Sequence, residues 1–403
     1  MSKYIFKAPN ILSILIIIPA LLMAVMPWTV ESKFNIDLLG YECSLFFLIG
    51  LLAMILMPKY YLLLSKQQKV EIILIVYLFI TFISSLLSSD ISFFTGWMIG
   101  IEFLLGYFFA KNIVYNKVII KFIRWSSLLI LLIILFQQTI FSFGLGWFES
   151  GAANNVEVLD GVLRVGTSVG GSTFTGIYVV LLIGILLGNT RHYYIDIFYL
   201  FIGLISVTLS GTRSAMIILI FAFIYLLFNK HSEVPKLYKC LSLMIIGIYI
   251  FPIIVDMFQS RSQEALRDTG DITSGRVVRW KFVFDYMNRH IENYIFGFGG
   301  GSVPISSFNV NVNPLASPHN AYLGILFQFG LFGFTLFISF LFSKVKSIVN
   351  KINTSVIILL GSLFVSFNSE VVTLNFLYSF YFWMLYYKII IDLNEKNCIY
   401  KCS

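Results

Sequence analysis

Long apolar runs separated by short polar connections dominate the chain. Runs of about 20 hydrophobic residues, enough for a helix to cross a bilayer, recur between residues 10 and 391. The one long polar connection is 259–318. We therefore predict an all-α integral membrane fold with about twelve transmembrane helices and one large extracytoplasmic loop between helices 9 and 10. The predicted helices are 10–28, 38–57, 71–89, 92–110, 122–143, 167–187, 193–209, 213–228, 238–258, 319–342, 354–371 and 374–391.

Composition supports a single polytopic membrane domain over residues 1–403. The chain is 58% hydrophobic and 12% charged, which is typical of a membrane protein. The first apolar run resembles a signal peptide but has no small-residue cleavage site, so we expect a retained helix. The net charge of +8 comes mostly from Lys in short loops, which membrane orientation explains. Nucleic-acid binding is not expected.

An even number of spans places both termini on one side of the membrane. With that side cytoplasmic, 19 of the 28 Lys and Arg residues lie inside and nine lie outside, as the positive-inside tendency predicts. Seven of the nine outer residues are Arg, whose planar fork suits phosphate or carboxylate. The alternative is that these arginines pair with outer carboxylates. Those carboxylates are Glu157, Asp160, Glu264, Asp268 and Asp271.

The turn Ser210-Gly211-Thr212-Arg213-Ser214 is the one helix-breaking cluster between Tyr193 and Phe228. It predicts a hairpin of two short helices, with Arg213 at the outer membrane boundary. An Arg in such a hairpin is a candidate functional residue. The alternative is that its side chain extends to the lipid headgroups.

The segment SGRVVRW, residues 274–280, predicts a helix in the large loop. Ser274 is the expected N-cap, and Arg276 and Arg279 would stand near the positive end of the helix, where an anion is favoured. An apolar stripe would make this helix amphipathic and able to lie along the membrane surface. The stripe consists of Val277, Trp280, Phe284 and Met287. The alternative role for the helix is binding of anionic lipid.

Two further stretches in or beside this loop suggest chemistry. The glycine-rich segment 297–301 can form a backbone nest for phosphate, although a flexible turn explains it equally well. Ser317-Pro318-His319-Asn320 predicts an N-cap and first turn, which would hold His319 neutral at the membrane boundary as a general base. The alternative is a hydrogen-bonded interfacial histidine. Glu102 and Glu370 are either catalytic partners or structural partners of Arg.

These motifs together resemble the O-antigen ligase and O-antigen polymerase superfamily of bacterial membrane glycosyltransferases. The resemblance spans residues 160–391. It rests on SGTRSA, SGR-x3-W, the glycine-rich segment, PHN-x-YL and QFGLFG in that order. It implies an inverting glycosyltransferase without metal or cofactor at the outer face of the cytoplasmic membrane. The implied donor is a glycan on undecaprenyl diphosphate.

The resemblance also implies residue roles. Arg213 and Arg276 would bind the diphosphate and stabilise it as a leaving group, while His319 would deprotonate or orient the acceptor hydroxyl. Independently of the resemblance, Glu370 is a candidate partner carboxylate because of its position in a span. The further residues expected to bind diphosphate or glycan are Arg164, Arg279, Trp280, Gly299, Asn320 and Tyr322.

Three functions remain open at this stage. A polymerase of O-antigen or capsular repeat units is favoured by the SGR-x3-W and PHN-x-YL contexts, and it would work beside membrane lipid and a chain-length regulator. A ligase would move the polymer onto lipid A-core. A lipid-linked-sugar flippase would place its polar residues deep in the bundle, whereas most of the outer arginines lie in loops.

Overall fold

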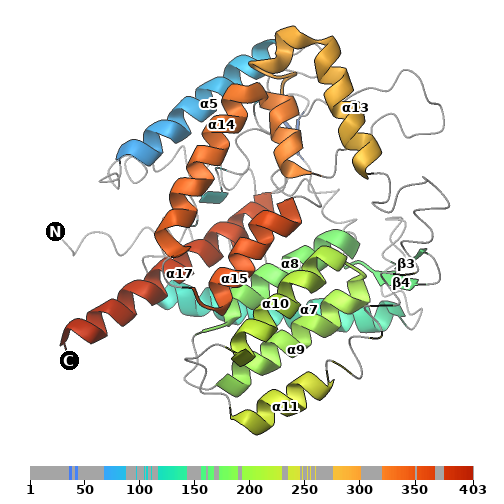
Figure 1. The fold of residues 1–403 in the computed structure, drawn as a ribbon, viewed down its shortest axis with the longest axis vertical. Helices are drawn as coiled ribbons and strands as arrows, with labels where there is room; N and C mark the ends of the chain where they lie inside the picture. The colour runs from blue at the N-terminus through green and yellow to red at the C-terminus, as the bar shows by residue number, and fades with distance from the viewer. Residues whose placement is uncertain are drawn as a thin grey trace.

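The computed structural model of the 403-residue chain is mainly helical (Figure 1). The structure describes residues 36–38, 41–43, 68–87, 97, 104, 106–107, 110, 117–142, 156–159, 162–167, 172–188, 193–228, 235–245, 247, 252, 255, 259, 276–300, 320–349, 352–367 and 376–402. Predicted helix 10–28 lies outside these residues, as do most of 92–110 and much of 246–258.

Most of the described residues are in helices. The helices are α5 (Gln68–Leu87), α7 (Lys117–Ser142), α8 (Ser172–Leu186), α9 (Tyr193–Ser210), α10 (Arg213–Phe228), α11 (Lys236–Ile245), α13 (Arg276–Arg289), the 3-10 helix η2 (Ile291–Tyr294), α14 (Ala321–Val349), α15 (Thr354–Gly361), the π-helix η3 (Ser362–Ser366) and α17 (Phe376–Cys402). Two antiparallel hairpins join β1 (Ile36–Leu38) to β2 (Tyr41–Cys43) and β3 (Val156–Leu159) to β4 (Val162–Val165).

Several predicted helices are confirmed. Helices α5, α7, α9 and α10 match the predicted ranges within a few residues. Two predicted starts are wrong, because β2 occupies the beginning of 38–57 and α8 begins five residues later than 167. Among the described residues, three helices are long and apolar enough to cross a membrane. They contain Ile123–Ile140, Tyr193–Ser210 and Ala321–Lys346.

Helix α8 is the centre of the bundle. Its residues from Thr175 to Leu186 are all buried, and it contacts α7, α9, α10, α15 and α17. A helix that is apolar on every side is stable only when other helices surround it. In Figure 1 the green α8 accordingly lies among the other helices of the lower half.

The bundle has two distinct ends. We call the site end the one that holds Ser172 at the start of α8, the α9–α10 turn and the last residues of η3. At the opposite end, α8 finishes at Leu186, and α9 and α15 begin. The α9–α10 turn thus lies at the site end, and the end of α8 and the start of α9 lie at the opposite end.

Charged side chains at the opposite end pair with one another. The Lys388 ammonium donates to the backbone carbonyl of Leu187, lies 3.1 Å from Ser355 Oγ and is 3.2 Å from Asp392 Oδ2. Arg124 Nη2 is 3.8 Å from Asp392 Oδ1. These contacts bury Lys388, and Lys344 on α14 is buried as well.

Helix α14 is broken at Gly330, whereas a continuous helix was predicted. Gly330 has φ of 65° and ψ of −170°, and Figure 1 shows two orange arms that meet at an angle. Residues 295–299 replace the hydrogen bonds lost at the break. Phe298 N–H donates to Phe327 O at 3.0 Å, Gly299 N–H to Gln328 O at 2.9 Å and Phe332 N–H to Ile295 O at 3.3 Å.

Helix α13 packs on the first arm of α14 through a face that differs from the predicted stripe. Val283 and Met287 are buried against Leu323 and Phe327. Val277 and Phe284 are 49% and 45% exposed. Of the four residues of the predicted stripe, Val277 and Phe284 therefore remain available to a membrane surface. The face of α13 that is buried depends on its contact surface on α14, and the local sequence pattern of α13 contains no information on that surface.

Candidate functional site

The α9–α10 turn holds Arg213 at the site end of the bundle. Gly211 has φ of 64°, a conformation that favours glycine, and its N–H donates to Thr208 O at 3.0 Å. Helix α10 then begins at Arg213, as the sequence predicted. The side chain of Arg213 is partly buried. The turn thus fixes the Arg213 backbone while the side chain still reaches the surface.

Hydroxyl groups of the same turn anchor it to α8. Thr212 Oγ1 donates to Ser172 O at 3.0 Å and lies 2.9 Å from Ser210 Oγ. Gly176 permits this approach, because a Cβ at that position would lie 2.5 Å from Thr212 Cβ. Ser210 and Thr212 therefore have a structural role within SGTRSA. They set the position of Arg213 relative to the first turn of α8.

A second buried polar contact fixes α9 to α7 near this end. Gln138 Nε2 donates to Ser206 O at 3.0 Å, and Ser206 Oγ donates to Gln138 Oε1 at 2.6 Å. Both side chains are fully buried. Because a buried amide must find partners, this reciprocal pair sets the register of α7 against α9. The α9–α10 turn follows four residues later.

Arg164 lies in the β3–β4 hairpin between α7 and α8. This hairpin was not predicted, because 144–166 reads as a loop. Strand β4 contacts α7 and α9, so it belongs to the site end. The strand register sets Arg164 opposite Glu157. Opposite charges stabilise such a position, and this is the register that the pairing alternative for Arg164 requires.

Asn320 is the N-cap of α14, so the predicted cap at Ser317 is wrong. Asn320 Oδ1 accepts the N–H of Leu323 at 3.0 Å, the typical contact of a cap residue, and the helix begins at Ala321. His319 therefore precedes the cap instead of standing in the first helical turn. His319, Ser317 and Glu370 themselves lie outside the described residues.

Tyr322 joins the start of α14 to η3. Its hydroxyl donates to Leu363 O at 2.9 Å. This carbonyl is accessible because the Phe367 N–H reaches back to Ser362 O in the π-helical pattern instead of to Leu363. Tyr322 also packs on Phe367 with ring centroids 5.6 Å apart. The contact places the residues just after His319 beside the end of η3.

The glycine-rich segment contacts protein instead of forming an open nest. The N–H of Gly299 is donated to Gln328 O, so this amide does not match the predicted phosphate donor. A Cβ at Gly297 would lie 2.3 Å from Gln328 O, and one at Gly330 would lie 2.3 Å from Ile295 O. The glycines of FGFGGG and QFGLFG therefore allow two backbones to touch.

Arg276 and Arg279 lie in the first turn of α13, and both side chains are partly exposed. Trp280 packs beside the buried cluster that joins α13 to α14. The structure thus brings Trp280 to the first arm of α14, and α14 reaches η3 through Tyr322. Helix α10, which carries Arg213, contacts η3 in turn. The two arginine motifs are therefore linked through α14 and η3.

Sequence reasoning missed a group of hydroxyls near Tyr322. Ser362 and Ser366, the first and last residues of η3, and Tyr378, near the start of α17, are buried, with the Tyr378 side chain next to both serines. The signal was weak, because Ser362 and Ser366 lie in an apolar run. Only their spacing of four places them on one helical face.

No group of three or more His, Cys, Asp or Glu residues suited to a metal is formed within the described part of the chain. His290, to which the sequence assigned no role, lies 3.3 Å from Glu292 Oε1. Its ring is 4.9 Å from that of Tyr286. It belongs to the aromatic group beneath α13.

Comparison with known families decides the assignment. Residues 198–338 match the family model described as O-antigen ligase, and this segment holds both arginine motifs and His319. The match over this segment supports the O-antigen ligase and polymerase superfamily. No curated protein matches the sequence. The superfamily accounts for a helical membrane protein with glycosyltransferase-like activity on lipid-linked oligosaccharides.

Proposed function

We propose that this protein polymerises undecaprenyl-diphosphate-linked oligosaccharide repeat units, of O-antigen or capsule, at the outer face of the cytoplasmic membrane. The single observation that supports transfer from a lipid-linked donor is the family match over 198–338, and the choice of the polymerase rests on the SGR-x3-W and PHN-x-YL contexts of the sequence. The structure supports the proposal in one respect. The SGTRSA turn, which is bound to α8, holds Arg213 at the site end, and Tyr322 of the PHN-x-YL segment contacts η3 at the same end.

Arg213 and Arg276 act on the donor in this proposal. As the glycosidic bond to the donor breaks, negative charge develops on the departing diphosphate, and fixed guanidinium groups stabilise it. Arg164 and Arg279 supply further positive charge to the same anion. Trp280 offers an aromatic face for the glycan.

His319 acts on the acceptor. Its imidazole takes the proton of the attacking sugar hydroxyl, with Glu370 as a partner carboxylate, and the new bond forms with inversion at the donor carbon. Asn320 and Tyr322 make their observed contacts within the protein, so their role is to position the segment that carries His319. No step uses a metal or cofactor.

The proposed architecture has about twelve spans in one domain, both termini in the cytoplasm and loop 259–318 outside, with the superfamily region covering 160–391. Labelling with a membrane-impermeant thiol reagent tests this orientation. The test uses variants that each retain a single cysteine. A cysteine introduced as Ser307→Cys should react with the reagent in cells with a permeabilised outer barrier. Native Cys240, which is exposed in α11, should stay protected. The reverse pattern contradicts the proposed orientation.

The second candidate is a ligase, which the description of the matched family favours. One assay separates the two. Purified protein receives an undecaprenyl-diphosphate repeat unit as its sole substrate, and a ladder of lengthened lipid-linked glycans supports the polymerase. Product formed only after addition of lipid A-core means that the protein is the ligase. Movement of the donor across vesicles without transfer would indicate a flippase.

A further inference from the structure

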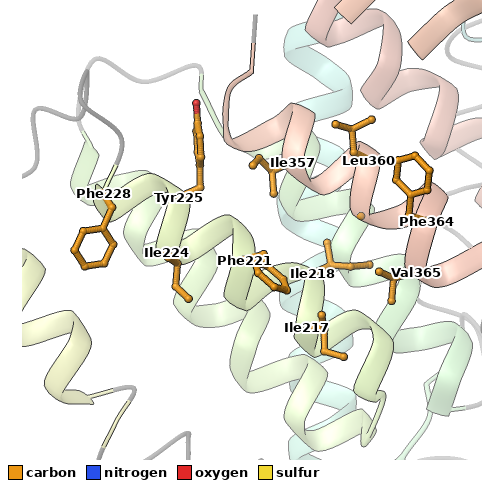
Figure 2. A pocket seen from close by; sticks show the side chains of 11 residues that line it. Ile217, Ile218, Phe221, Ile224, Tyr225, Phe228, Ile357, Leu360, Phe364 and Val365 are labelled. Carbon is orange, nitrogen blue, oxygen red and sulfur yellow. The ribbon is translucent and has the colours of Figure 1, made fainter. Parts of the chain in front are cut away.

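An apolar groove runs along the outside of the bundle between α10 and the α15–η3 segment. Its volume is about 650 Å³. Ile217, Phe221, Ile224 and Phe228 line it from α10, and Leu360 and Phe364 line it from the other side (Figure 2). Ten of its eleven lining residues carry no polar side chain, the exception being Tyr225. The groove therefore suits a hydrocarbon chain.

Arg213 stands at the head of this groove. The residues Arg213, Ile217, Phe221, Ile224 and Phe228 are spaced by four, four, three and four positions, which places them on one face of a helix. Ile217 is thus one turn below Arg213. At a rise of 1.5 Å per residue, the stripe from Arg213 to Phe228 extends about 22 Å. A ligand held by its anionic group at Arg213 would continue into the groove.

The groove opens to the surroundings of the protein and has a firm floor. Phe221, Phe228 and Phe364 are 62%, 59% and 56% exposed, so in a membrane its mouth faces lipid. The floor is the close approach of α15 to α10 at Gly361, where a Cβ would lie 2.8 Å from Ile218 Cγ2. Tyr225 donates its hydroxyl to Ile352 O at 2.7 Å near the far end.

We infer that this groove binds the polyisoprenoid tail of the lipid-linked donor whose diphosphate is bound at Arg213. The inference rests on the proposed function and adds the place where the lipid is held. The alignment of an arginine with an apolar channel of matching direction favours one long chain with an anionic head. The rigid branched and aromatic walls suit a methyl-branched chain, which fills irregular space by many small contacts.

The test compares two donors that carry the same glycan diphosphate on tails of different length. One has the full undecaprenyl tail, and the other has a tail of two isoprene units. Ile224→Trp fills the middle of the groove without touching Arg213. Ile205→Trp on α9 is the matched control, because Ile205 is 45% exposed and Ile224 is 42% exposed, and Ile205 does not line the groove.

We expect Ile224→Trp to raise KM for the long-tailed donor by at least about tenfold, since burial of two CH2 groups already carries a factor of that size. Turnover of the short-tailed donor should be unchanged, and Ile205→Trp should behave like the unaltered protein with both donors. An unchanged preference for the long tail in Ile224→Trp would overturn the inference.

A binding measurement keeps failure of the groove apart from failure of the proposed function. Undecaprenyl diphosphate with a photoreactive group in its tail is irradiated with the full-length protein, and the labelled peptides are identified. Labelling of α10 and η3 that undecaprenyl diphosphate competes away, and excess phosphatidylglycerol does not, supports the groove even if no transfer occurs. Equal competition by phosphatidylglycerol overturns it, because the groove would then hold bulk lipid.

Discussion

Charged side chains have different surroundings at the two ends of the helical bundle. At the opposite end, Lys388, Asp392 and Arg124 lie within 4 Å of a partner of opposite charge, and Lys388 also binds Leu187 O and Ser355. At the site end, the contacts that hold the chain are made by neutral groups: Thr212, Gln138, Ser206 and Tyr322. Arg213, in the turn at that end, is partly exposed.

This difference suggests that the charged residues of the opposite end serve stability, whereas those of the site end serve function. A buried ion pair keeps its partners satisfied but leaves little of the charge for a ligand. Neutral hydroxyl and amide contacts position helices without adding a field of their own. Substitutions at the opposite end should therefore change the free energy of unfolding, and substitutions in the site-end motifs should change transfer.

The largest effect on transfer is expected for His319→Ala. Loss of a general base lowers the rate by about 100- to 10,000-fold, whereas binding of the lipid-linked donor should stay intact because the arginines are unchanged. Single-turnover transfer and donor binding are measured on the same preparation. His290→Ala is the control, since His290 pairs with Glu292 beneath α13. A loss of only severalfold in His319→Ala would reduce His319 to an orienting role.

At the opposite end, Lys388→Ala should destabilise the protein by about 3 kcal/mol, because removing one member of a buried ion pair leaves the other unpaired. The measurement is chemical unfolding in detergent micelles, together with the transfer rate of the remaining folded protein. That rate should be near normal. Lys346→Ala, at an exposed position of α14, should change stability by about 0.5 kcal/mol or less. If Lys388→Ala and Lys346→Ala are equally stable, the ion pairs of the opposite end do not contribute to stability as this comparison of the two ends requires.

A smaller effect is expected when the charge of Arg213 is kept but its shape is changed. Arg213→Lys loses the bidentate fork, and loss of charge-assisted hydrogen bonds of about 1.5–3 kcal/mol corresponds to about 10- to 100-fold in activity. Arg276→Lys should behave alike. Arg289→Lys, exposed at the end of α13, is the control. Near-normal glycan production from both motif variants would show that these residues act as bulk positive charge.

The smallest effect concerns the neutral scaffold of the site end. Ser206→Ala leaves the buried Gln138 Oε1 without its 2.6 Å donor, which costs about 1–3 kcal/mol. Thermal unfolding should show this loss with transfer per folded molecule unchanged. Ser214→Ala, in the same hairpin but only partly buried, provides the comparison. A transfer defect larger than the stability defect would mean that the α7–α9 contact also tunes the site.

Local signals predicted the parts of the fold that depend on neighbouring residues. The bounds of α10 follow from one helix-breaking cluster between two apolar runs, and the structure has the turn at Gly211. Helix α13 likewise begins within two residues of the predicted cap. The position of Arg213 at a helix start is a direct consequence of this turn, so this part of the candidate site was predictable.

The sequence did not predict features that depend on distant partners. The break at Gly330 is stable because residues 295–299 supply its hydrogen bonds, about 30 positions earlier in the chain. The buried face of α13 depends on Leu323 and Phe327. The cap at Asn320 was missed because Ser317 and Pro318 form a stronger local signal than a lone Asn.

The contact between Gly297 and Gly330 also has a consequence for synthesis of the protein. The first arm of α14 has nine residues and is about 13 Å long, too short to cross a bilayer, whereas the second has 19 residues and about 28 Å. A ribosome makes residues 295–299 before Gly330. Residues 295–299, which supply the hydrogen bonds at the break in α14, are therefore already synthesised when Gly330 leaves the ribosome. The second arm can then insert as the spanning segment, and the first arm can pack directly against residues 295–299.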